Sequence, residues 1–518
     1  MISPEVVILS RWQFGLTAMY HFIFVPLTLG LSILLAIMET VYVITDTDIW
    51  KQMTKYWGLL FGINFAMGVA TGITMEFQFG TNWAYYSQYV GDIFGAPLAI
   101  EGLMAFFLEA TFIGLFFFGW ARLPKLGHWV VTWLVAIGSS FSALWILIAN
   151  GWMSHPVGAH FDFHTMRMEI TNFKELLFNP VAQAKFVHTI SAGYVTGAVF
   201  VLAISAYFLL RDRNIELAKR SMTVAVSFGL ASALAVVVLG DESGYLANSM
   251  QKMKVAAIEG MWQTEPAPAP FTLFGIPDQE NHVTRYKIQI PYLIGIIATR
   301  SFDQRLLGIN DLVAINKTRI KTGMKAYAAL SALQKNPDDP AQQALLQRYA
   351  NTLGYALLLK QFTDNPAKAT AVQIDQAAWS TVPGHLIYLF WTFRAMVACG
   401  FFFILLFAVG FYLSMVRKLD KPWFLYIALW SLPLPWIAAE SGWFVAEHGR
   451  QPWVVEGILP TFLGSSSLMN HDLIISLTGF ILFYTVLAVI EIYLMIKYIR
   501  LGPDGMEKKY QSTETVYD

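Results

Sequence analysis

Cysteine and charged residues are both scarce in this 518-residue chain. Its single cysteine, Cys399, excludes an internal disulfide, a cysteine-ligated iron–sulfur cluster, a C-x-x-C-H haem attachment and a zinc site built from several cysteines. The formal net charge is zero, which gives no support for nucleic-acid binding. A P-loop and a Rossmann glycine pattern are also missing, so nothing indicates nucleotide hydrolysis or a nicotinamide or flavin domain.

Clustered metal ligands are missing as well. The sequence has no histidine pair of the kind a haem–copper centre needs and no cysteine pair for a binuclear copper site. It shows no internal repeat and no low-complexity tract. Residues 1–10 lack a basic region and a cleavage site, so we expect the first apolar run to be a span and not a signal peptide.

Apolar residues dominate what is present. Hydrophobic residues make up 56% of the chain and charged residues 14%, whereas soluble domains carry about 25% charge. Aromatic residues contribute 15%, including 17 tryptophans, which suits membrane-interface belts or cofactor pockets. The composition therefore predicts an all-α polytopic membrane protein.

Runs of about 20 apolar residues each predict nine transmembrane helices. They lie near residues 14–43, 54–80, 95–120, 128–150, 184–210, 221–241, 384–414, 423–446 and 470–499. Short connections after the odd-numbered runs carry basic residues: Lys51, Lys55, Arg122, Lys125, Arg211, Arg213, Lys219, Arg220, Arg417, Lys418, Lys421, Lys497, Arg500, Lys508 and Lys509. The connection 80–95 has none, so the positive-inside rule predicts an N-terminus outside and a C-terminus in the cytoplasm.

One long segment, from about 241 to 383, is polar and helix-like and contains no spanning run. Residues 266–270 predict a proline-rich turn, and 325–359 predict an amphipathic helix pair broken near Pro337 and Pro340. The topology places this segment outside, as a docking domain or a substrate lid. The predicted organisation is spans one to six in 1–241, an outer loop in 242–383, spans seven to nine in 384–500 and a cytoplasmic tail in 501–518.

Two acidic residues, Glu101 and Glu109, lie inside the third apolar run. Ionisable side chains are costly in hydrocarbon and normally face a protein interior or a water path. Eight residues of helix give about 12 Å of rise and roughly 80° of rotation, so both acids can line one path without touching. This spacing suits a proton relay. The nearby serines could add hydroxyl links or simply pack helices together: Ser139, Ser140 and Ser142.

Two histidines are candidate iron ligands, His21 in the first run and His188 in the fifth. A neutral imidazole is a common haem ligand, and a hydrogen-bonded core histidine is the alternative for each. His385 competes, but it lies at the start of its span, where a solvated role is favoured. Met396 alone is typical of packing. Arg394 is less ordinary, because a buried arginine needs an anion and a haem propionate would serve.

A further group ends the eighth run, where Glu440 and Glu447 are seven residues apart on one helix face with Trp443 between them. A structural ion pair between Glu447 and Arg450 is the alternative to a functional role. Three residues at the start of the outer loop are typical of a solvated helix face when taken alone: Lys254, Glu259 and Trp262.

Four short runs, at 19–28 (MYHFIFVPLT), 75–83 (MEFQFGTNW), 240–243 (GDES) and 449–453 (GRQPW), resemble the large subunit of cytochrome bd quinol oxidases. The similarity extends from about residue 8 to 504. It implies nine spans with a periplasmic quinol loop after the sixth, here of the long-loop branch.

The resemblance also implies three haems. His188 and Met396 would be the axial ligands of a low-spin haem b, with Arg394 on a propionate. A Met/His pair raises the reduction potential, which suits an acceptor of quinol electrons. His21 and Glu447 would each hold one iron of the two-haem oxygen site. Family members differ in the placement of these two haems, and the closer resemblance puts haem d on His21 and high-spin haem b on Glu447.

Matching positions extend to proton and quinol chemistry. The resemblance places Glu101 at haem d as a distal ligand or proton donor, and Glu109 and Ser142 on a cytoplasmic proton path. Four more positions match: Trp443 and Arg450 beside the haems, and Lys254 and Glu259 at the quinol site. Glu259 would accept a quinol proton. Oxygen would be reduced to water with cytoplasmic protons, which separates charge without a pump.

The implied setting is the bacterial inner membrane, with a second large subunit (subunit II), a small single-span subunit, quinol, oxygen and lipid as partners. Two rivals differ in class. A proton-coupled transporter would favour broken helices and a repeated half, and neither is present. A haem b subunit of a quinol dehydrogenase would show two His–His ligand pairs, for which the spans contain too few histidines.

Overall fold

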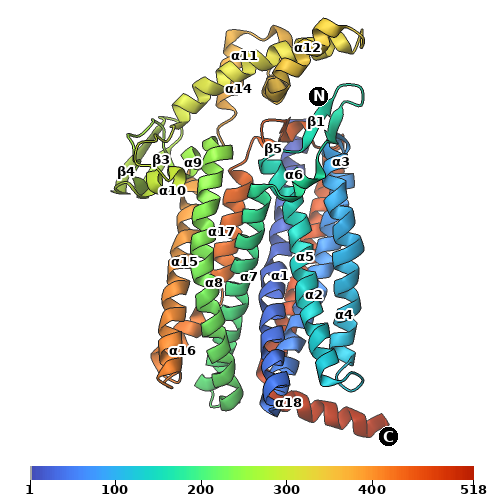
Figure 1. Ribbon diagram of the computed structural model, residues 1–518, viewed down its shortest axis with the longest axis vertical. Coiled ribbons are helices and arrows are strands. Elements are labelled where there is room, and N and C mark those ends of the chain that lie inside the picture. Colours follow the sequence, from blue (N-terminus) through green and yellow to red (C-terminus); the bar gives the residue numbers. More distant parts are fainter. Residues whose placement is uncertain (1–2, 518) are drawn as a thin grey trace.

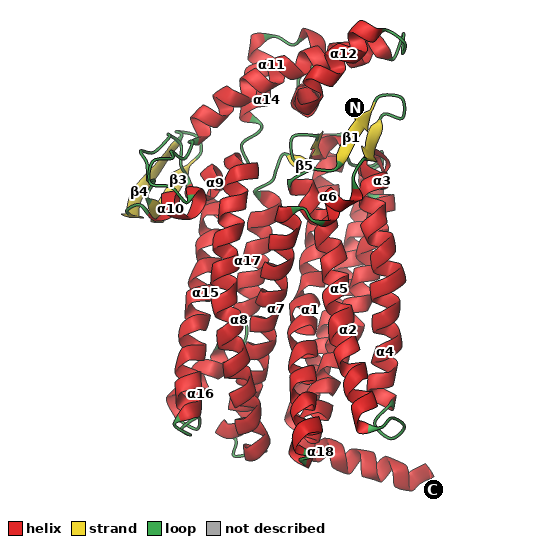
Figure 2. Cartoon of the chain, in the orientation of Figure 1, coloured by secondary structure: helices red, strands yellow, loops and turns green. Residues whose placement is uncertain are grey.

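A bundle of long helices makes up most of the molecule (Figures 1 and 2). The computed structural model describes residues 3–517, with side chains described through residue 505. Within the described residues, nine helical segments are long and apolar enough to cross a membrane. The predicted all-α fold with nine spans is therefore confirmed. The side chains of Lys508 and Lys509, part of the charge pattern, lie outside the described residues.

The spanning segments are built from eleven α-helices and one π-helix. They are α1 (Pro4–Thr45), α2 (Asp48–Thr81), α3 (Ala84–Ile100), the π-helix η1 (Glu101–Phe106), α4 (Phe107–Phe118), α5 (Lys125–Ser154), α7 (Pro180–Leu210), α8 (Ile215–Met250), α15 (Leu386–Met415), α16 (Pro422–Trp430) with α17 (Leu434–His448), and α18 (Asn470–Tyr517). The segment α3–η1–α4 forms one span, and so do α16 and α17.

The remaining elements lie between the spans. They are β1 (Ala159–Asp162), β2 (Arg167–Ile170), α6 (Phe173–Leu177), α9 (Lys252–Glu259), β3 (Phe271–Asp278), β4 (Val283–Ile290), α10 (Leu293–Thr299), α11 (Ile309–Leu333), α12 (Pro340–Tyr349), η2 (Ala350–Thr352), α13 (Leu353–Leu357), η3 (Leu358–Gln361), η4 (Pro366–Lys368), α14 (Ala371–Trp379), β5 (Trp453–Val455), β6 (Leu459–Pro460) and η5 (Thr461–Leu463).

Several helices extend beyond the spans that the sequence predicts. The third span begins at Ala84, eleven residues before the predicted 95, because a polar helical turn precedes its apolar part. Helix α8 continues to Met250 through the charged residues Asp241 and Glu242. Helix α18 continues from the last span as far as Tyr517, with a change of direction at Gly502, whose φ is 72°, and the cytoplasmic tail predicted from residue 501 stays a prediction.

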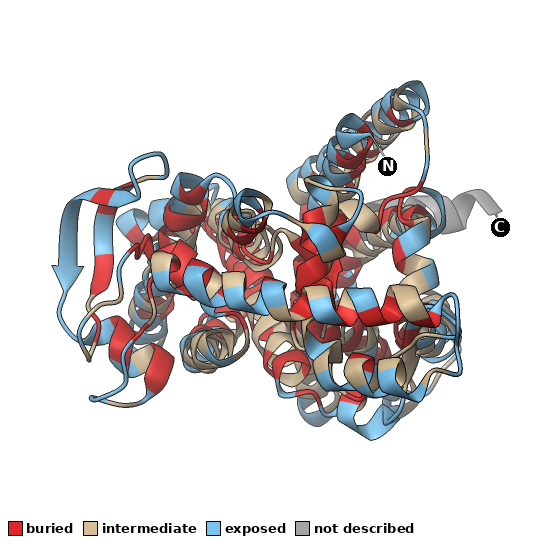
Figure 3. Cartoon of the chain, turned by 90° about the horizontal axis from the view of Figure 1, so that it is seen from above, coloured by how far each residue is buried: buried red, intermediate tan, exposed pale blue. Residues whose placement is uncertain are grey.

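The segment between α8 and α15 lies beyond one end of the bundle and extends across it when viewed from above (Figures 1 and 3). It is not purely helical, because β3 and β4 pair as an antiparallel hairpin. The predicted helix pair is present as α11 and α12, interrupted near Pro337 and Pro340, although α11 already begins at Ile309. A separate apolar core joins α9, α11 and α14 to the ends of α15 and α17.

Helix α7 is the centre of the bundle. In its most apolar window 83% of residues are buried, against 11% in the spans 84–118 and 470–505. Glycines allow its close approach to α1, since a Cβ on Gly30 would lie 2.3 Å from the Gly193 carbonyl oxygen. Burying α7 in this way places His188 and Lys185, near its beginning, inside the protein.

Candidate functional site

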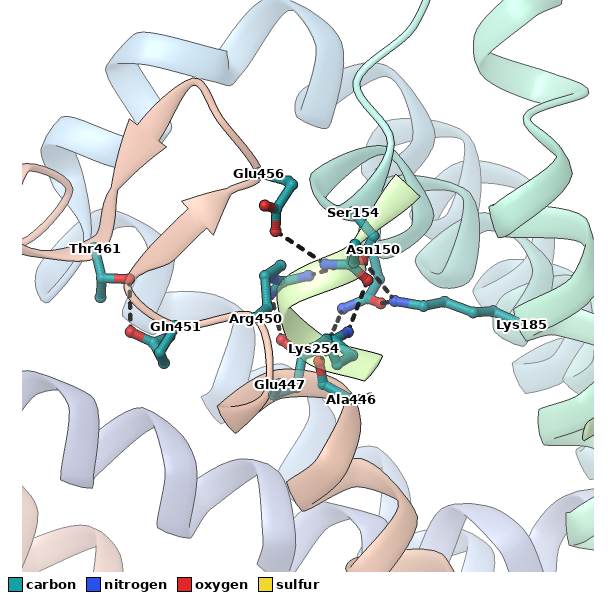
Figure 4. A network of polar contacts seen from close by, with 11 residues as sticks. Asn150, Ser154, Lys185, Lys254, Ala446, Glu447, Arg450, Gln451, Glu456 and Thr461 are labelled. Carbon is teal, nitrogen blue, oxygen red and sulfur yellow. Dashed lines mark hydrogen bonds and ion pairs between the residues drawn. The ribbon is translucent and has the colours of Figure 1, made fainter. Parts of the chain in front are cut away.

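A polar network, here called the outer cluster, joins α5, α7, α9 and α17 at the end of the bundle that carries the outer segment (Figure 4). At its centre Arg450 donates to the Glu447 carboxylate, and Asn150 donates to the other Glu447 oxygen at 3.1 Å. Arg450 also donates to the Ser154 hydroxyl at 3.3 Å. The ion pair named as the structural alternative is thus present, and it fixes Glu447 from two sides.

Lys185 completes this side of the outer cluster. Its Nζ donates to Asn150 Oδ1 at 2.6 Å and to the Ser154 hydroxyl at 3.0 Å. The side chain of Asn150 is therefore held by Lys185 while it holds Glu447. Neither Lys185 nor Asn150 was predicted, although a lysine three residues before His188 in an apolar run is the kind of signal that marks a functional site.

Lys254 belongs to the same cluster and is only 7% exposed. Its Nζ donates to Gln251 Oε1 at 2.7 Å and to the Ala446 carbonyl at 2.8 Å. Burial lowers the pKa of Lys254, and the nearby Arg450 lowers it further. The interpretation of this residue as part of a solvated helix face was wrong, because α9 is enclosed between the bundle and the outer segment.

A cavity of about 670 Å³ lies above the outer cluster. The bundle contributes Arg450 and Lys254 to its wall, and the outer segment contributes Arg319 and Tyr355. Glu456 also lines it and accepts a hydrogen bond from Gln251 at 3.1 Å. The cavity therefore has charged side chains of the outer cluster on one wall and residues of the outer segment on the other.

Glu259 lies at the other end of α9 and pairs with Arg394 of α15 at 3.1 Å. Both side chains are buried, at 2% and 6% exposure. Glu259 Oε2 also accepts from the Thr272 amide at 3.3 Å, whereas Oε1 is buried without a hydrogen-bond partner. Burial raises the pKa of Glu259 to about 7. The Arg394 guanidinium and the Thr272 amide lower this pKa, but by less than burial raises it.

Arg394 also donates to backbone carbonyls. Its Nε donates to Thr272 at 2.8 Å, and its Nη1 donates to Ile258 at 2.7 Å and to Phe390 at 2.9 Å. Its anion in this structure is Glu259, and the pairing with a haem propionate stays a prediction. Lys254 and Glu259 are five residues apart on α9, which is roughly 140° of rotation. They therefore contact different groups.

His188 and Met396 lie at similar depths, roughly 12 Å and 15 Å along α7 and α15 from the helix beginnings. His188 Nδ1 is buried and has no hydrogen-bond partner. Each residue faces a glycine. A Cβ on Gly240 of α8 would lie 3.5 Å from His188 Cε1, and one on Gly442 of α17 would lie 3.0 Å from Met396 Sδ. Glycine at both positions keeps space open beside the two side chains.

His21 lies midway along α1, where its Nδ1 is 2.9 Å from the Thr71 hydroxyl of α2. Helix α17 packs beside this point. Trp443 contacts Phe22 edge-on with ring centres 5.2 Å apart, and Trp436 donates to the Ile23 carbonyl at 2.7 Å. The predicted residues His21 and Trp443 are thus brought to neighbouring positions by two helices more than 400 residues apart in sequence.

Glu101 and Glu109 are each bonded to a serine of α5. Ser142 donates to Glu101 at 2.7 Å, and Ser139 donates to Glu109. Of the two alternatives left open for the serines, Ser139 and Ser142 thus form hydroxyl links to the acids, whereas Ser140 donates to its own helix, at the Ala136 carbonyl. The relative rotation expected for an α-helix was wrong, because the π-helix Glu101–Phe106 begins at the first acid. Such segments are frequent at functional sites.

Comparison with known proteins identifies the family. The model of the family described as "Cytochrome bd terminal oxidase subunit I" matches residues 9–503. The chain belongs to this family. It is therefore a large subunit of a terminal respiratory oxidase and a multi-span membrane protein. Both rival classes, the transporter and the dehydrogenase subunit, are excluded by this match.

Similar proteins support the same assignment over nearly the full chain. The chain is 52% identical over 506 residues, 98% of each protein, to "Cytochrome bd-II ubiquinol oxidase subunit 1" of Escherichia coli (strain K12). It is 35% identical over 499 residues, 96% of this chain and 94% of the other, to "Cytochrome bd ubiquinol oxidase subunit 1" of Bacillus subtilis (strain 168). The solved bd oxidase from Geobacillus thermodenitrificans aligns with a TM-score of 0.78 and 25% identity, covering 97% of this chain and all of that one.

Haem cofactors follow from family membership, and the side chains described above fit them. His188 offers a buried ring nitrogen with no protein partner, and glycines keep space free beside it and beside Met396. His21 has one ring nitrogen bonded to Thr71, which leaves the other for a metal. Glu447 uses one lone pair on each oxygen and retains acceptor capacity.

Proposed function

We propose that this chain oxidises quinol at the end of the bundle that carries the outer segment and reduces oxygen to water between His21 and Glu447. The two relatives described above are named ubiquinol oxidases, which supports a quinol:oxygen oxidoreductase. Two quinols release four electrons and four protons, and one oxygen molecule takes up the same numbers to form two waters. The chain must therefore hold redox groups and provide separate sites for proton release and proton uptake.

The redox groups are three haems. His188 and Met396 hold the low-spin haem b, His21 holds haem d, and Glu447 holds the high-spin haem b, with Arg394, Arg450 and Trp443 beside them. When bound, these haems supply the one-electron chemistry and oxygen reduction. The buried, unpartnered Nδ1 of His188 and the two glycines are the observations that support the first assignment. The clamp of Arg450 and Asn150 on Glu447 supports the third, because ligating carboxylates are themselves hydrogen-bonded.

Glu259 is the base that accepts a quinol proton, and the environment of its carboxyl group is the observation that carries the proposal. Its Oε1 is buried and unpartnered, and its pKa of about 7 is close to the operating pH, as general acid–base catalysis requires. Arg394 holds the other oxygen and so orients the carboxyl group. Lys254, whose pKa burial lowers, contributes to the quinol site from the other side of α9.

Glu109 and Glu101 deliver protons to the oxygen site. Both lie along one span, and Ser139 and Ser142, three residues apart on α5, hold the two carboxyl groups in sequence. A carboxyl group bound by a hydroxyl can take up and pass on a proton, and intramembrane acids of this kind form proton relays. Glu101 lies nearer the oxygen site and Glu109 nearer the proton source.

The orientation follows from the charge pattern. Residues 1–241 and 384–500 are the membrane parts, 242–383 form a periplasmic quinol loop, and 501–518 form a cytoplasmic tail. The N-terminus is periplasmic and the protein resides in a bacterial inner membrane. Quinol protons leave outside and chemical protons enter from inside, which is electrogenic without a pump. A second large subunit, a small single-span subunit and lipid cover the exposed apolar faces of the spans.

A reduced-minus-oxidised absorption spectrum of the purified oxidase tests the assignment. His188→Ala should remove the low-spin haem b signal and leave the other two haem signals, because the remaining ligands are on other helices. A spectrum in which His188→Ala retains the low-spin signal would remove His188 from the ligand set. Glu259→Gln should retain all three signals and lose quinol oxidation. Retained quinol oxidation in that variant would refute the role of Glu259.

A further inference from the structure

The proposed iron ligand His21 is bonded to a threonine of the neighbouring helix α2. The Thr71 hydroxyl is 2.9 Å from His21 Nδ1, and Thr71 is fully buried. The same hydroxyl lies 3.0 Å from the Met67 carbonyl and 3.0 Å from the Gly68 carbonyl, both in its own helix. One oxygen atom thus faces one ring nitrogen and two carbonyl oxygens.

Counting hydrogens decides the direction of this bond. A threonine hydroxyl has one hydrogen to donate, and carbonyl oxygens can only accept. If that hydrogen is directed at the two carbonyls, the hydroxyl oxygen must accept from His21 Nδ1–H. The opposite arrangement would direct the hydroxyl lone pairs at both carbonyl oxygens, each 3.0 Å away, and puts the ring hydrogen on Nε2. The geometry therefore favours the tautomer with hydrogen on Nδ1 and a free lone pair on Nε2.

The neighbouring residues fix the same geometry. A Cβ on Gly72 would lie 3.1 Å from His21 Cε1 and 3.6 Å from Nε2, so glycine lets the ring lie against α2. Tyr484 of α18 is fully buried, and its hydroxyl donates to the Thr71 carbonyl at 3.1 Å and lies 2.6 Å from the Thr74 hydroxyl. The last span thereby braces the turn of α2 that carries Thr71.

We propose that Thr71 is a positioning residue for His21: its hydroxyl accepts from Nδ1–H, fixes the ring tautomer and aims the Nε2 lone pair at the haem iron. This rests on the proposed function, in which His21 is an iron ligand. Hydrogen bonds of this type orient the imidazole and raise its basicity, and their loss typically weakens metal binding by about 10–100-fold.

The test is a comparison of three variants of the purified oxidase. Thr71→Val has nearly the same shape as the native residue and removes the acceptor. Thr71→Ser restores it. Thr54→Val is the matched control, because Thr54 is also fully buried in α2 and donates to its own helix, at the Trp50 carbonyl 2.9 Å away. The readouts are the absorption band of the haem at His21, its midpoint potential and its retention during dilution.

We expect Thr71→Val to weaken retention of that haem by about 10–100-fold and to shift its band and potential. Thr71→Ser and Thr54→Val should resemble the native oxidase. A Thr71→Val variant with unchanged band, potential and retention would overturn the proposal, and so would an equal loss in Thr54→Val. His21→Ala distinguishes a failure of the ligand assignment from a failure of the positioning role of Thr71. If it keeps the haem signal, the ligand assignment itself is wrong; if it loses the signal while Thr71→Val is unchanged, only the positioning role fails.

Discussion

The four carboxylates assigned a role here form two groups that differ in their partners. Glu259 and Glu447, near the outer segment, each pair with an arginine. Glu101 and Glu109, deeper in the bundle, are bonded to serines, and none of the ion pairs among the described residues includes either of them. An arginine compensates a buried negative charge and fixes its position, whereas a serine supplies only a hydrogen bond. The first arrangement suits orientation and ligation, and the second suits exchange of protons.

The largest expected effect concerns the serine-bonded group. Glu109→Ala removes a proton carrier, so we expect oxygen uptake to fall by about 10²–10⁴-fold, the usual contribution of a positioned acid or base. The low-spin haem spectrum should stay intact, because Glu109 contacts none of its proposed ligands. Oxygen uptake by membranes measures the loss of activity, and an absorption spectrum of the same preparation shows whether the low-spin haem is intact. Native uptake in this variant would exclude Glu109 from the proton path.

Breaking an arginine-bonded pair should instead affect stability. Arg394→Gln leaves Glu259 buried without its cation, which typically costs about 3–5 kcal/mol of unfolding free energy. The double variant Arg394→Leu with Glu259→Leu should recover most of this loss, because replacing both partners leaves no unpaired charge. Thermal unfolding of the purified protein measures both variants. If the double variant is as unstable as the single one, the pair is not the source of the effect.

The pH dependence of quinol oxidation should follow Glu259. Its pKa of about 7 lies above the ordinary 4.5 of a glutamate, so the carboxyl is protonated below about pH 7 and cannot act as a base there. We therefore expect kcat/KM to fall about tenfold per pH unit below pH 7, since one proton blocks the base. Glu259→Gln should lose this acid limb together with most activity. An acid limb retained in the residual activity would assign it to another group.

The smallest expected effect is at Ser139. Ser139→Ala removes the hydrogen bond to Glu109, worth about 1 kcal/mol, which corresponds to a slowing of roughly fivefold. Ser140→Ala is the matched control, because Ser140 donates to its own helix and should leave the rate unchanged. Oxygen uptake compares the two. Equal rates in both variants would mean that the Ser139 hydroxyl has no part in proton delivery.

The sequence predicted the membrane spans and the candidate residues better than it predicted which side chains contact each other. Apolar runs and the positions of ionisable residues within them were sufficient for the nine spans and for Glu101, Glu109, His21 and His188 as candidates. It did not predict the β3–β4 hairpin, whose strands are stabilised by pairing with each other. Nor did it predict the π-helix that begins at Glu101, where Ser142 of α5 donates to the carboxylate.

Partners were decided by tertiary structure alone. Thr71 and His21 are 50 residues apart, and Lys254 and Ala446 are 192 apart. Nothing in the local sequence of Thr71 distinguishes it from Thr54. The physical reason is that the cost of placing a residue in a membrane depends mainly on that residue and its neighbours along the chain. A hydrogen bond or ion pair instead depends on which distant helix supplies the second atom. The sequence by itself therefore determined which residues are costly in the membrane, and the packing of the helices decided what each of them contacts.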